Sequence, residues 1–302
     1  MNYIQLYFSS IITVLIVLGI LINKFEKYTP VYVKNLFHYG KTSTKSKHKL
    51  LIEVPKSWFK HFYVYSSLLS TFMLVLVVLK RVYSIVPFNS LVVDIFEFLS
   101  SSARFYNVSE TSATLALFLY TLHSYRRFYE THFISIFGKN SKMNVLHYLS
   151  GFSNFSAAVF AILLETTIFS RNAKAIIASH WTDLEIIDII ASILFLWASW
   201  KQYRLGIILA NLRKNEKGFI VTQGHKLPKG DWFDYVSSPH LLAEILIYIA
   251  LTTILRKNGT WMYLFVWVIC NQIECALLTH WWYQDTFKDM PKQRKAIIPF
   301  IY

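Results

Sequence analysis

Residues 213–244 read RKNEKGFIVTQGHKLPKGDWFDYVSSPHLLAE, a polar stretch between two long apolar runs of the chain. The stretch is basic and aromatic, it is punctuated by Gly and Pro, and it ends by carrying Glu244 into the second apolar run. An ionisable side chain at membrane depth is costly and usually faces a bundle interior or a cavity. We therefore expect residues 213–244 to form a site for an anionic ligand at a bilayer surface.

The composition of the whole chain indicates a polytopic membrane protein. Hydrophobic residues make up 54% of the 302 residues, and the mean hydropathy is +0.37. Several apolar stretches approach the ~20 residues with which a helix spans a bilayer. The predicted spans are residues 3–23, 61–79, 111–128, 144–169, 186–203, 240–256 and 261–283. The expected fold class is all-α, a bundle of seven transmembrane helices with its cofactor site on the cytosolic side.

The distribution of charge predicts how this bundle is oriented. A further apolar stretch, Ile85–Leu99, is short and contains a proline and two acids, so we interpret it as an interfacial or re-entrant helix. With that choice, most of the 31 Lys and Arg residues fall in the first, third and fifth loops and in the C-terminal tail. The positive-inside rule then places the N-terminus in the lumen and the C-terminus in the cytosol. The sequons at Asn107 and Asn258 fall on the luminal side, although both lie too close to the bilayer for us to expect glycosylation.

Several familiar chemistries are excluded by the sequence. The net charge of +14 is explained by cytosolic loops that face anionic headgroups, so we do not expect nucleic-acid binding. The chain has no G-x-G-x-x-G, no P-loop, no G-x-S-x-G, no H-E-x-x-H and no Cys pair at zinc spacing, so we expect neither a soluble nucleotide domain nor a metal site. Cys270 and Cys275 lie in the last predicted span on different helical faces, so no disulfide is expected. The first predicted span has no basic residue before its apolar core, which is typical of a retained anchor.

Polar side chains gather at or inside the predicted spans of the C-terminal half. They are Gln202, Tyr203, Arg204, His240, Glu244, Asn271, Gln272, Glu274, His280 and Tyr283. His240 and Glu244 are four residues apart and share a helical face, as do His280 and Gln284. For any one of them an interhelical hydrogen bond is as good an interpretation as a ligand contact, but the cluster as a whole favours a site.

Two long motifs give the chain a specific resemblance. GDWFDYVSSPHLLAE at 230–244 and PKQRKAIIPF at 291–300 closely resemble the C-terminal domain of the steroid 5-alpha-reductase family, and within it the polyprenol reductase branch. Shorter matching pieces are Val54-Pro55, His61–Tyr63, Leu122–Arg127 and Asn211–Asn215. The resemblance runs through most of the chain and is weakest in the first 50 residues.

This resemblance implies a reductase of the endoplasmic reticulum membrane that takes NADPH from the cytosolic side and reduces a carbon–carbon double bond. It implies an N-terminal membrane region on the substrate side, 1–130, and a C-terminal catalytic domain on the NADPH side, 131–302. The cofactor-binding residues that it carries over are Gln202, Arg213, His225, Lys226, His240, Glu244, His280 and Tyr283. Arg213 and Lys226 suit the 2′-phosphate and diphosphate, and Glu244 can accept from a ribose hydroxyl or the carboxamide. Without the resemblance, the two cations read equally well as ordinary cytosolic-loop charges.

Several positions bear on the substrate. Glu53 falls on the acid that binds the substrate oxygen in steroid-reducing relatives, but their Tyr partner falls on Ser124 here, beside His123. The loss of that Tyr points away from a steroid. His240 stands where the family commonly has Asn, and Gly206 where steroid-reducing relatives carry an acid. Glu53 reads equally well as a solvated residue at the end of a basic loop, and His123 as a core histidine.

The chemistry of hydride transfer narrows the substrate further. The alkene of an allylic alcohol is not electrophilic, whereas an alkene conjugated to an aldehyde accepts hydride at its β-carbon. We therefore expect polyprenal rather than polyprenol as the substrate, with protonated Glu53 or His123 polarising the carbonyl oxygen. The product would be a saturated, dolichol-type lipid for protein N-glycosylation. The expected partners are a long-chain isoprenoid and membrane lipids, and no obligate protein partner is inferred. The alternatives are a 3-oxo-steroid or enoyl-lipid reductase and a non-enzymatic lipid carrier, which would not need residues 213–244.

Overall fold

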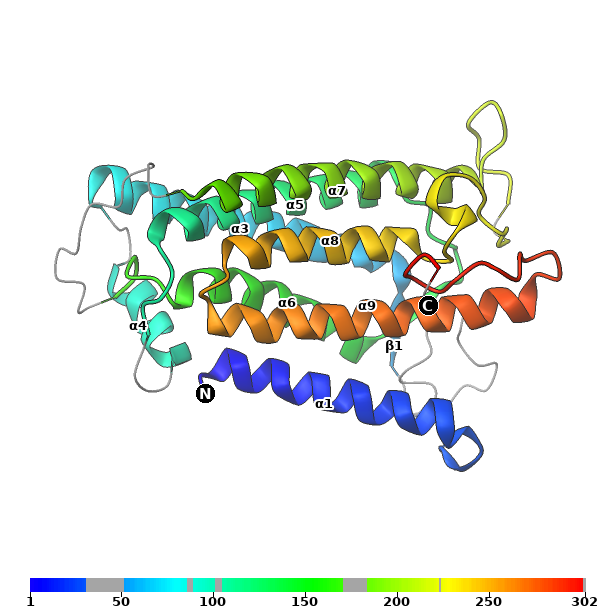
Figure 1. The fold of residues 1–302 in the computed structure, drawn as a ribbon, viewed down its shortest axis with the longest axis horizontal. Coiled ribbons are helices and arrows are strands. Elements are labelled where there is room, and N and C mark those ends of the chain that lie inside the picture. Colours follow the sequence, from blue (N-terminus) through cyan, green and yellow to red (C-terminus); the bar gives the residue numbers. More distant parts are fainter. Residues whose placement is uncertain (31–51, 86–88, 101–104, 171–183, 223, 301–302) are drawn as a thin grey trace.

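The computed structural model describes residues 1–30, 52–85, 89–100, 105–170, 184–222 and 224–300, which form an elongated helical bundle (Figure 1). Its α-helices are α1 Tyr3–Lys24, α3 Phe59–Tyr83, α4 Asn89–Ser100, α5 Glu110–Tyr129, α6 Val145–Leu164, α7 Ile186–Asn211, α8 Pro239–Ile254 and α9 Gly259–Thr286. Short turns of 3-10 helix cover Glu26–Tyr28, Lys56–Trp58 and Asp231–Asp234, and a π-helical turn, Glu130–Ile134, follows α5. Strands β1 Glu53–Pro55 and β2 Lys142–Asn144 pair antiparallel, with Val54 opposite Met143.

The mostly helical fold is confirmed, since each predicted span coincides largely with a helix. Among the described residues, four helices have the length and hydropathy of a membrane span: Tyr3–Ile22, Lys56–Tyr83, Val145–Leu164 and Gly259–Thr286. Helix α8 is apolar but shorter. Helix α5 has a lower mean hydropathy because it carries charged residues at its ends, such as Arg126 and Arg127, and buried polar side chains such as His123. The count of seven spans stays a prediction, as does the membrane depth of α4, which packs on α1 and α6.

The predicted span 144–169 was wrong in its last five residues, because α6 ends at Leu164. The next residue, Glu165, turns its carboxylate onto the first turn of α9. Its oxygens accept from the backbone N–H of Gly259 at 3.0 Å and of Thr260 at 2.6 Å. The first N–H groups of a helix have no partner within the helix and favour a negative charge, so a carboxylate from a neighbouring element satisfies both needs.

The same end of the bundle, which also carries the N-terminus in Figure 1, is held by buried polar pairs. Asn258 is fully buried, and its amide donates to the carbonyl of Ala161 at 2.8 Å, so this sequon is closed to glycosylation in the folded protein. Arg256 donates to the buried carboxylate of Asp188 at 2.6 Å. Burial of charge is tolerated here because the charge is paired.

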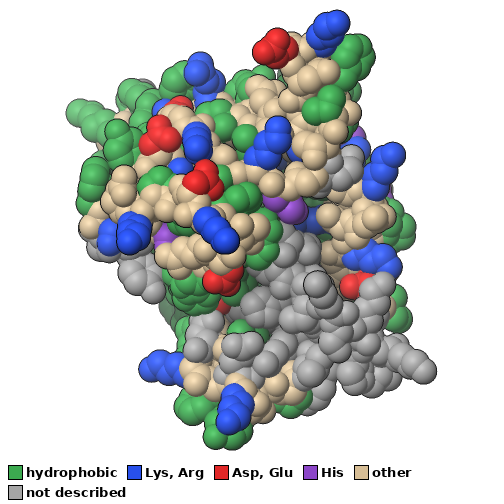
Figure 2. All heavy atoms as spheres, turned by 90° about the vertical axis from the view of Figure 1, so that its right-hand side faces the viewer, with side chains coloured by type: hydrophobic (Ala, Val, Ile, Leu, Met, Phe, Trp, Pro, Cys, Tyr) green, Lys and Arg blue, Asp and Glu red, His purple; other side chains and the backbone are tan. Residues whose placement is uncertain are grey.

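The helices enclose one large apolar core and leave an apolar surface outside it. Helix α7 packs most extensively on α8, α3 on α5, and α1 on α9. On the outer face of α7, Ile189, Ile193 and Trp197 are 53%, 62% and 45% exposed, a pattern that favours contact with lipid rather than water. Figure 2 looks onto the opposite end, which carries the connection from α7 to α8. There Lys, Arg, Asp and Glu side chains are spread over the face and hydrophobic side chains gather at its edges.

Candidate functional site

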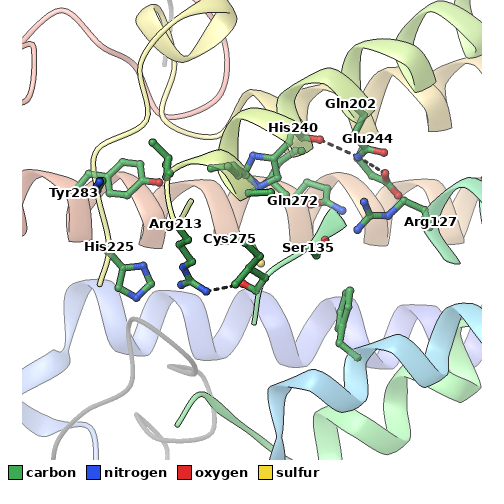
Figure 3. Close-up of a pocket in the computed structure, with 18 of the residues that line it drawn as sticks. Arg127, Ser135, Gln202, Arg213, His225, His240, Glu244, Gln272, Cys275 and Tyr283 are labelled. Atoms are coloured by element: carbon green, nitrogen blue, oxygen red, sulfur yellow. Dashed lines mark hydrogen bonds between the residues drawn. The ribbon is translucent and has the colours of Figure 1, made fainter. Parts of the chain in front are cut away.

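A cavity of about 470 Å³ lies at this charged end, enclosed chiefly by α7, α8, α9 and the connection between α7 and α8 (Figure 3). We call it the polar cavity. It is lined by Phe59, Tyr63, Arg127, Ser135, Ile136, Gln202, Gly206, Leu209, Ala210, Leu212, Arg213, Gly224, His225, Lys226, His240, Leu241, Glu244, Asn271, Gln272, Cys275 and Tyr283. Arg213, His225 and Lys226 come from the connection, whereas Arg127, the amides and a carboxylate come from the helices. The cavity therefore offers donors for an anion at one end and acceptors for hydroxyl or amide groups at the other.

Arg213 reaches the polar cavity from a hairpin that follows α7. The backbone N–H of Val221 donates to the carbonyl of Arg213 at 3.0 Å. Gly218 sits in the turn with a φ of 82°, a left-handed conformation that glycine adopts without a steric penalty. The Arg213 guanidinium donates to the carbonyl of Ile136 at 2.5 Å, so its charge is fixed against the wall rather than left in solvent.

The segment that follows residues 224–226 is held in place by the second long motif, 291–300. The backbone N–H of Ser237 donates to the carbonyl of Lys295 at 2.8 Å. Arg294 is buried and donates to the carbonyl of Pro228 at 3.2 Å. Burial lowers the pKa of the Arg294 guanidinium, whose usual value lies far above neutral pH. The two motifs that carry the family resemblance are thus parts of one structure, although they are separated by α8 and α9.

The structure brings seven of the eight predicted cofactor residues to the polar cavity. These are Gln202, Arg213, His225, Lys226, His240, Glu244 and Tyr283. His280 is the exception, because it does not line the cavity. Its ring nitrogens form hydrogen bonds with the Ser237 hydroxyl at 2.8 Å and with the Gln284 amide at 3.0 Å. The shared helical face predicted for His280 and Gln284 is confirmed. Through Ser237, His280 contacts the 230–244 motif and can hold it in position.

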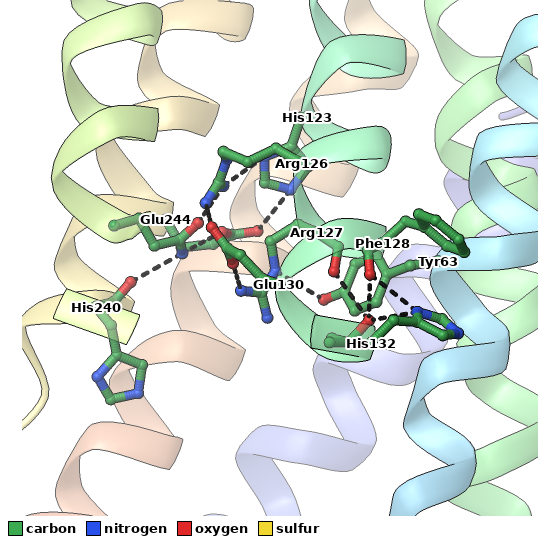
Figure 4. A network of polar contacts seen from close by, with 11 residues as sticks. Tyr63, His123, Arg126, Arg127, Phe128, Glu130, His132, His240 and Glu244 are labelled. Carbon is green, nitrogen blue, oxygen red and sulfur yellow. Dashed lines mark hydrogen bonds and ion pairs between the residues drawn. The ribbon is translucent and has the colours of Figure 1, made fainter. Parts of the chain in front are cut away.

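Glu244 is the acid that the sequence places in the apolar run, and the structure surrounds it with hydrogen-bond donors (Figure 4). The Gln202 amide donates to its carboxylate at 2.6 Å and also to the backbone carbonyl of His240 at 3.0 Å. The Nε2 atom of His123 lies 3.5 Å from the other carboxylate oxygen. The orientation of Glu244 is therefore set by groups from α5 and α7.

Two arginines at the end of α5 extend this network. Arg126 and Arg127 bind different oxygens of Glu130, which is only 3% exposed and begins the π-helical turn. Arg126 also donates to the side-chain oxygen of Gln202. Arg127 donates through Nε to the hydroxyl of Tyr63 at 3.3 Å, and its guanidinium lies 5.0 Å from the centre of that ring. Glu130 therefore connects the two branches of the network.

The charges in the network balance, and the contact with Arg126 determines which ring nitrogen of His123 carries the proton. Arg126 and Arg127 are matched by Glu130 and Glu244, as buried ions require. A second nitrogen of Arg126 lies 3.2 Å from Nδ1 of His123. Because an arginine N–H can only donate, Nδ1 must accept, and the proton of the neutral ring then sits on Nε2 and faces Glu244. Both nitrogens of His123 are thus engaged within the protein.

A second cavity, of about 380 Å³, adjoins the first and is walled mainly by aromatic and apolar groups. We call it the aromatic cavity. It is lined by Lys56, Phe59, Phe62, Tyr63, Tyr120, His123, Met143, His147, Ser150, Gly151, Asn154, Phe155, Ala158, Glu244, Tyr248, Leu264, Trp267, Val268, Asn271 and Gln272. Phe59, Tyr63, Glu244, Asn271 and Gln272 line both cavities. The two spaces therefore meet at Tyr63 and Glu244. Both cavities are lined by residues from the predicted N-terminal region, 1–130, and from the predicted C-terminal domain, 131–302.

The predicted substrate-side residues are not all brought together. Glu53 lines neither cavity. Its side chain is 33% exposed and lies 3.5 Å from the ammonium of Lys142, across the β1–β2 pair. Ser124 is buried and its hydroxyl is 2.7 Å from that of Ser66, so it joins α5 to α3. Gly206 does line the polar cavity, and a Cβ added there would meet no atom within 4 Å.

Sequence reasoning did not identify Tyr63 as part of the wall that the two cavities share, nor the charged residues of the network that contacts it. Tyr63, Arg126 and Arg127 were noted only as parts of matching motifs, and Glu130 was not noted at all. One signal for them is present in the sequence, because Glu130 follows the two arginines by four and three residues, the spacing of ion pairs on a helix. No local pattern shows that Tyr63, from another helix, meets this group.

Comparisons with known proteins show the family to which the chain belongs. The family model described as 3-oxo-5-alpha-steroid 4-dehydrogenase matches residues 142–302. The polyprenal reductase of Drosophila melanogaster is 38% identical over 99% of this chain and 93% of its own length. The polyprenal reductase of Caenorhabditis elegans is 34% identical, over 87% of this chain and 85% of its own. For that of Homo sapiens the identity is 32%, with 89% and 86% covered. The resemblance carried by 230–244 and 291–300 is confirmed: the chain belongs to the 3-oxo-5-alpha-steroid 4-dehydrogenase family, whose members are oxidoreductases.

Proposed function

We propose that this protein is a polyprenal reductase that uses NADPH to saturate the α-isoprene double bond, a step toward the dolichol-type carriers of protein N-glycosylation. The observation that carries the proposal is the meeting of the polar and aromatic cavities at Tyr63 and Glu244. A reductase of a lipid needs a polar space for its cofactor and an apolar space for its substrate, with one wall in common. The relatives that match nearly the whole chain bear the name of this activity.

The donor set of the polar cavity fits NADPH. Arg213, His225 and Lys226 form its cationic edge and suit the 2′-phosphate and the diphosphate. Deeper in the cavity, Gln202 and Glu244 offer partners for ribose hydroxyls or the carboxamide. NADPH bound there supplies the hydride, and the protein supplies orientation and electrostatics.

The aromatic cavity fits the reacting end of an isoprenoid. Phenyl and phenol rings form much of its wall, as at Phe62, Phe155 and Tyr248, and such rings are typical of pockets that bind apolar ligands. Glu53 lies outside this space, and His123 directs its Nε2 proton at Glu244. We therefore assign His123 to the orientation of Glu244, and the acid role predicted for Glu53 finds no support in the geometry.

The membrane orientation is part of the proposal. The end of the bundle that holds the polar cavity carries the basic connection between α7 and α8, and the positive-inside rule assigns such loops to the cytosol. NADPH would enter from the cytosol, and the protein would reside in the endoplasmic reticulum membrane with a luminal N-terminus. Cysteine labelling of Val221→Cys and Thr167→Cys in sealed microsomes tests this. An impermeant maleimide should reach residue 221 and not residue 167, and the reverse pattern would overturn the orientation.

Product analysis tests the proposed activity. The purified protein in nanodiscs is given NADPH with polyprenal, polyprenol or testosterone in parallel, and saturated products are measured by mass spectrometry. We expect turnover of polyprenal alone. Reduction of polyprenol with no aldehyde intermediate would refute the preference for the aldehyde, and turnover of testosterone alone would favour a steroid reductase. Failure to bind NADPH would favour a lipid carrier.

A further inference from the structure

The group that binds the substrate oxygen belongs where the two cavities meet. Hydride passes from one cavity to a carbon in the other, and in an α,β-unsaturated aldehyde the carbonyl oxygen is three bonds from the β-carbon. The polar side chains that line both cavities are Tyr63, Glu244, Asn271 and Gln272. The Glu244 carboxylate only accepts hydrogen bonds, and it is engaged by Gln202 and His123, so it cannot donate to a carbonyl oxygen.

Tyr63 differs from the two amides in the charge behind it. Its ring is 7% exposed, and its hydroxyl oxygen accepts from Nε of Arg127 at 3.3 Å. Because the oxygen accepts there, its own proton points away from Arg127 and is available as a donor. The Arg127 guanidinium can also stabilise negative charge that develops on the phenol oxygen. The side chains of Asn271 and Gln272 are neutral amides and do not act as acids in this way.

Arg127 is in turn held by Glu130. The Glu130 carboxylate binds both arginines from the π-helical turn, and it is buried, so its geometry is fixed by the fold rather than by solvent. Single turns of π-helix often occur at functional sites. The contact runs from Glu130 through Arg127 to Tyr63, so the position of the phenol depends on a side chain that touches neither cavity.

Building on the proposed function, we infer that Tyr63 is the catalytic acid that binds the aldehyde oxygen, and that Arg127 and Glu130 position it. The hydride that NADPH supplies leaves the cofactor oxidised to NADP⁺ and forms a C–H bond at the β-carbon. The alkene pair shifts toward the carbonyl carbon, and the carbonyl pair moves onto oxygen. The Tyr63 proton passes to that oxygen, and Arg127 balances the phenolate. The α-carbon then takes a proton from solvent while the enol proton returns to Tyr63. One hydride and one solvent proton are consumed, and the saturated aldehyde is released.

This assignment supplies a phenol at the site although the residue at position 124 is a serine. The sequence places Ser124 where steroid-reducing relatives have a tyrosine, and the structure turns its hydroxyl to Ser66 instead of a cavity. A phenol is still present in the shared wall, but it comes from α3 rather than from α5.

Paired substitutions test the inference. Tyr63→Phe removes only the hydroxyl, and we expect kcat for polyprenal to fall about 100-fold while Kd for NADPH stays unchanged. Tyr65→Phe is the matched control, because Tyr65 lies on the same helix and its hydroxyl contacts Ser156 at 2.6 Å outside both cavities. It should keep kcat within about twofold of the parent.

A double-mutant cycle separates positioning from general damage. Arg127→Met should lower kcat about tenfold in the parent and by clearly less in Tyr63→Phe, because the part of its contribution that passes through the phenol is already lost there. Arg127→Lys, which keeps the charge, should recover part of the loss. Parent-like kcat in Tyr63→Phe, or additive losses in the cycle, would overturn the role of Tyr63 and leave the proposed function standing. A parent protein that binds NADPH but does not reduce polyprenal would overturn the proposed function itself, and the inference with it.

Discussion

Replacing Glu244 with Gln changes the centre of the polar network while keeping its shape. The carboxylate accepts from Gln202 at 2.6 Å and faces Nε2 of His123 at 3.5 Å, and it offsets one of the two buried arginines. An amide has one oxygen and one NH₂ group, so in either orientation it sets a donor against a donor and leaves one positive charge unmatched. The proposed hydrogen bond from a ribose hydroxyl or the carboxamide of NADPH to this charged carboxylate is worth about 1.5–3 kcal/mol, and a neutral amide would lose much of it. The side chain is 15% exposed, so we take about 2 kcal/mol, or roughly thirtyfold in Kd.

Isothermal titration of the purified protein with NADPH measures this effect directly. Glu244→Gln should weaken binding by roughly thirtyfold. Glu53→Gln should shift Kd by less than about twofold, since exposed ion pairs contribute little and Glu53 lines neither cavity. Parent-like affinity in Glu244→Gln would refute the reasoning. So would a larger loss in Glu53→Gln, which would restore Glu53 to the site.

Two further substitutions test the edge of the polar cavity and the packing of the aromatic one. Lys226→Ala should raise KM for NADPH about tenfold and KM for NADH much less, because only NADPH carries the 2′-phosphate. Steady-state kinetics with both cofactors measures this difference. Lys229→Ala is the control, because the Lys229 side chain is 68% exposed. Gly151→Ala should lower the thermal unfolding midpoint, because a Cβ there would lie 2.6 Å from the buried ring of Phe62. Gly206→Ala, which has open space, should leave the midpoint unchanged or raise it, and equal effects of the two substitutions would contradict the packing described for Gly151.

Much of the fold could be predicted because the length of an apolar run indicates where a membrane helix begins and ends. Seven of the eight residues predicted to bind the cofactor line one cavity, and several of them come from motifs whose residues lie close together along the chain, such as 230–244. His280 was carried over with them, but its rotation on α9 turns it to Ser237, and the motif does not encode that rotation.

The substrate side was less predictable because it depends on contacts between distant elements. Glu53 sits in a strand that pairs with Lys142–Asn144, and this pairing keeps its side chain out of the cavities. Tyr63 is one of 19 tyrosines, and only the packing of α3 on α5 brings it to Arg127. The end of α6 at Leu164 was missed for the same reason, since Glu165 serves a helix that begins 94 residues later.

The contact between the 230–244 motif and residues 294–296 has a consequence for biosynthesis. One edge of the polar cavity is held by residues 294–296, which follow α9, so a nascent chain cannot complete that edge before α9 and these residues have been synthesised. We therefore expect the proposed cofactor to bind only after the C-terminal segment has been made. A chain cut after residue 293 would contain all the described helices, and we expect it to bind the proposed cofactor more weakly because the contacts made by residues 294–296 are missing.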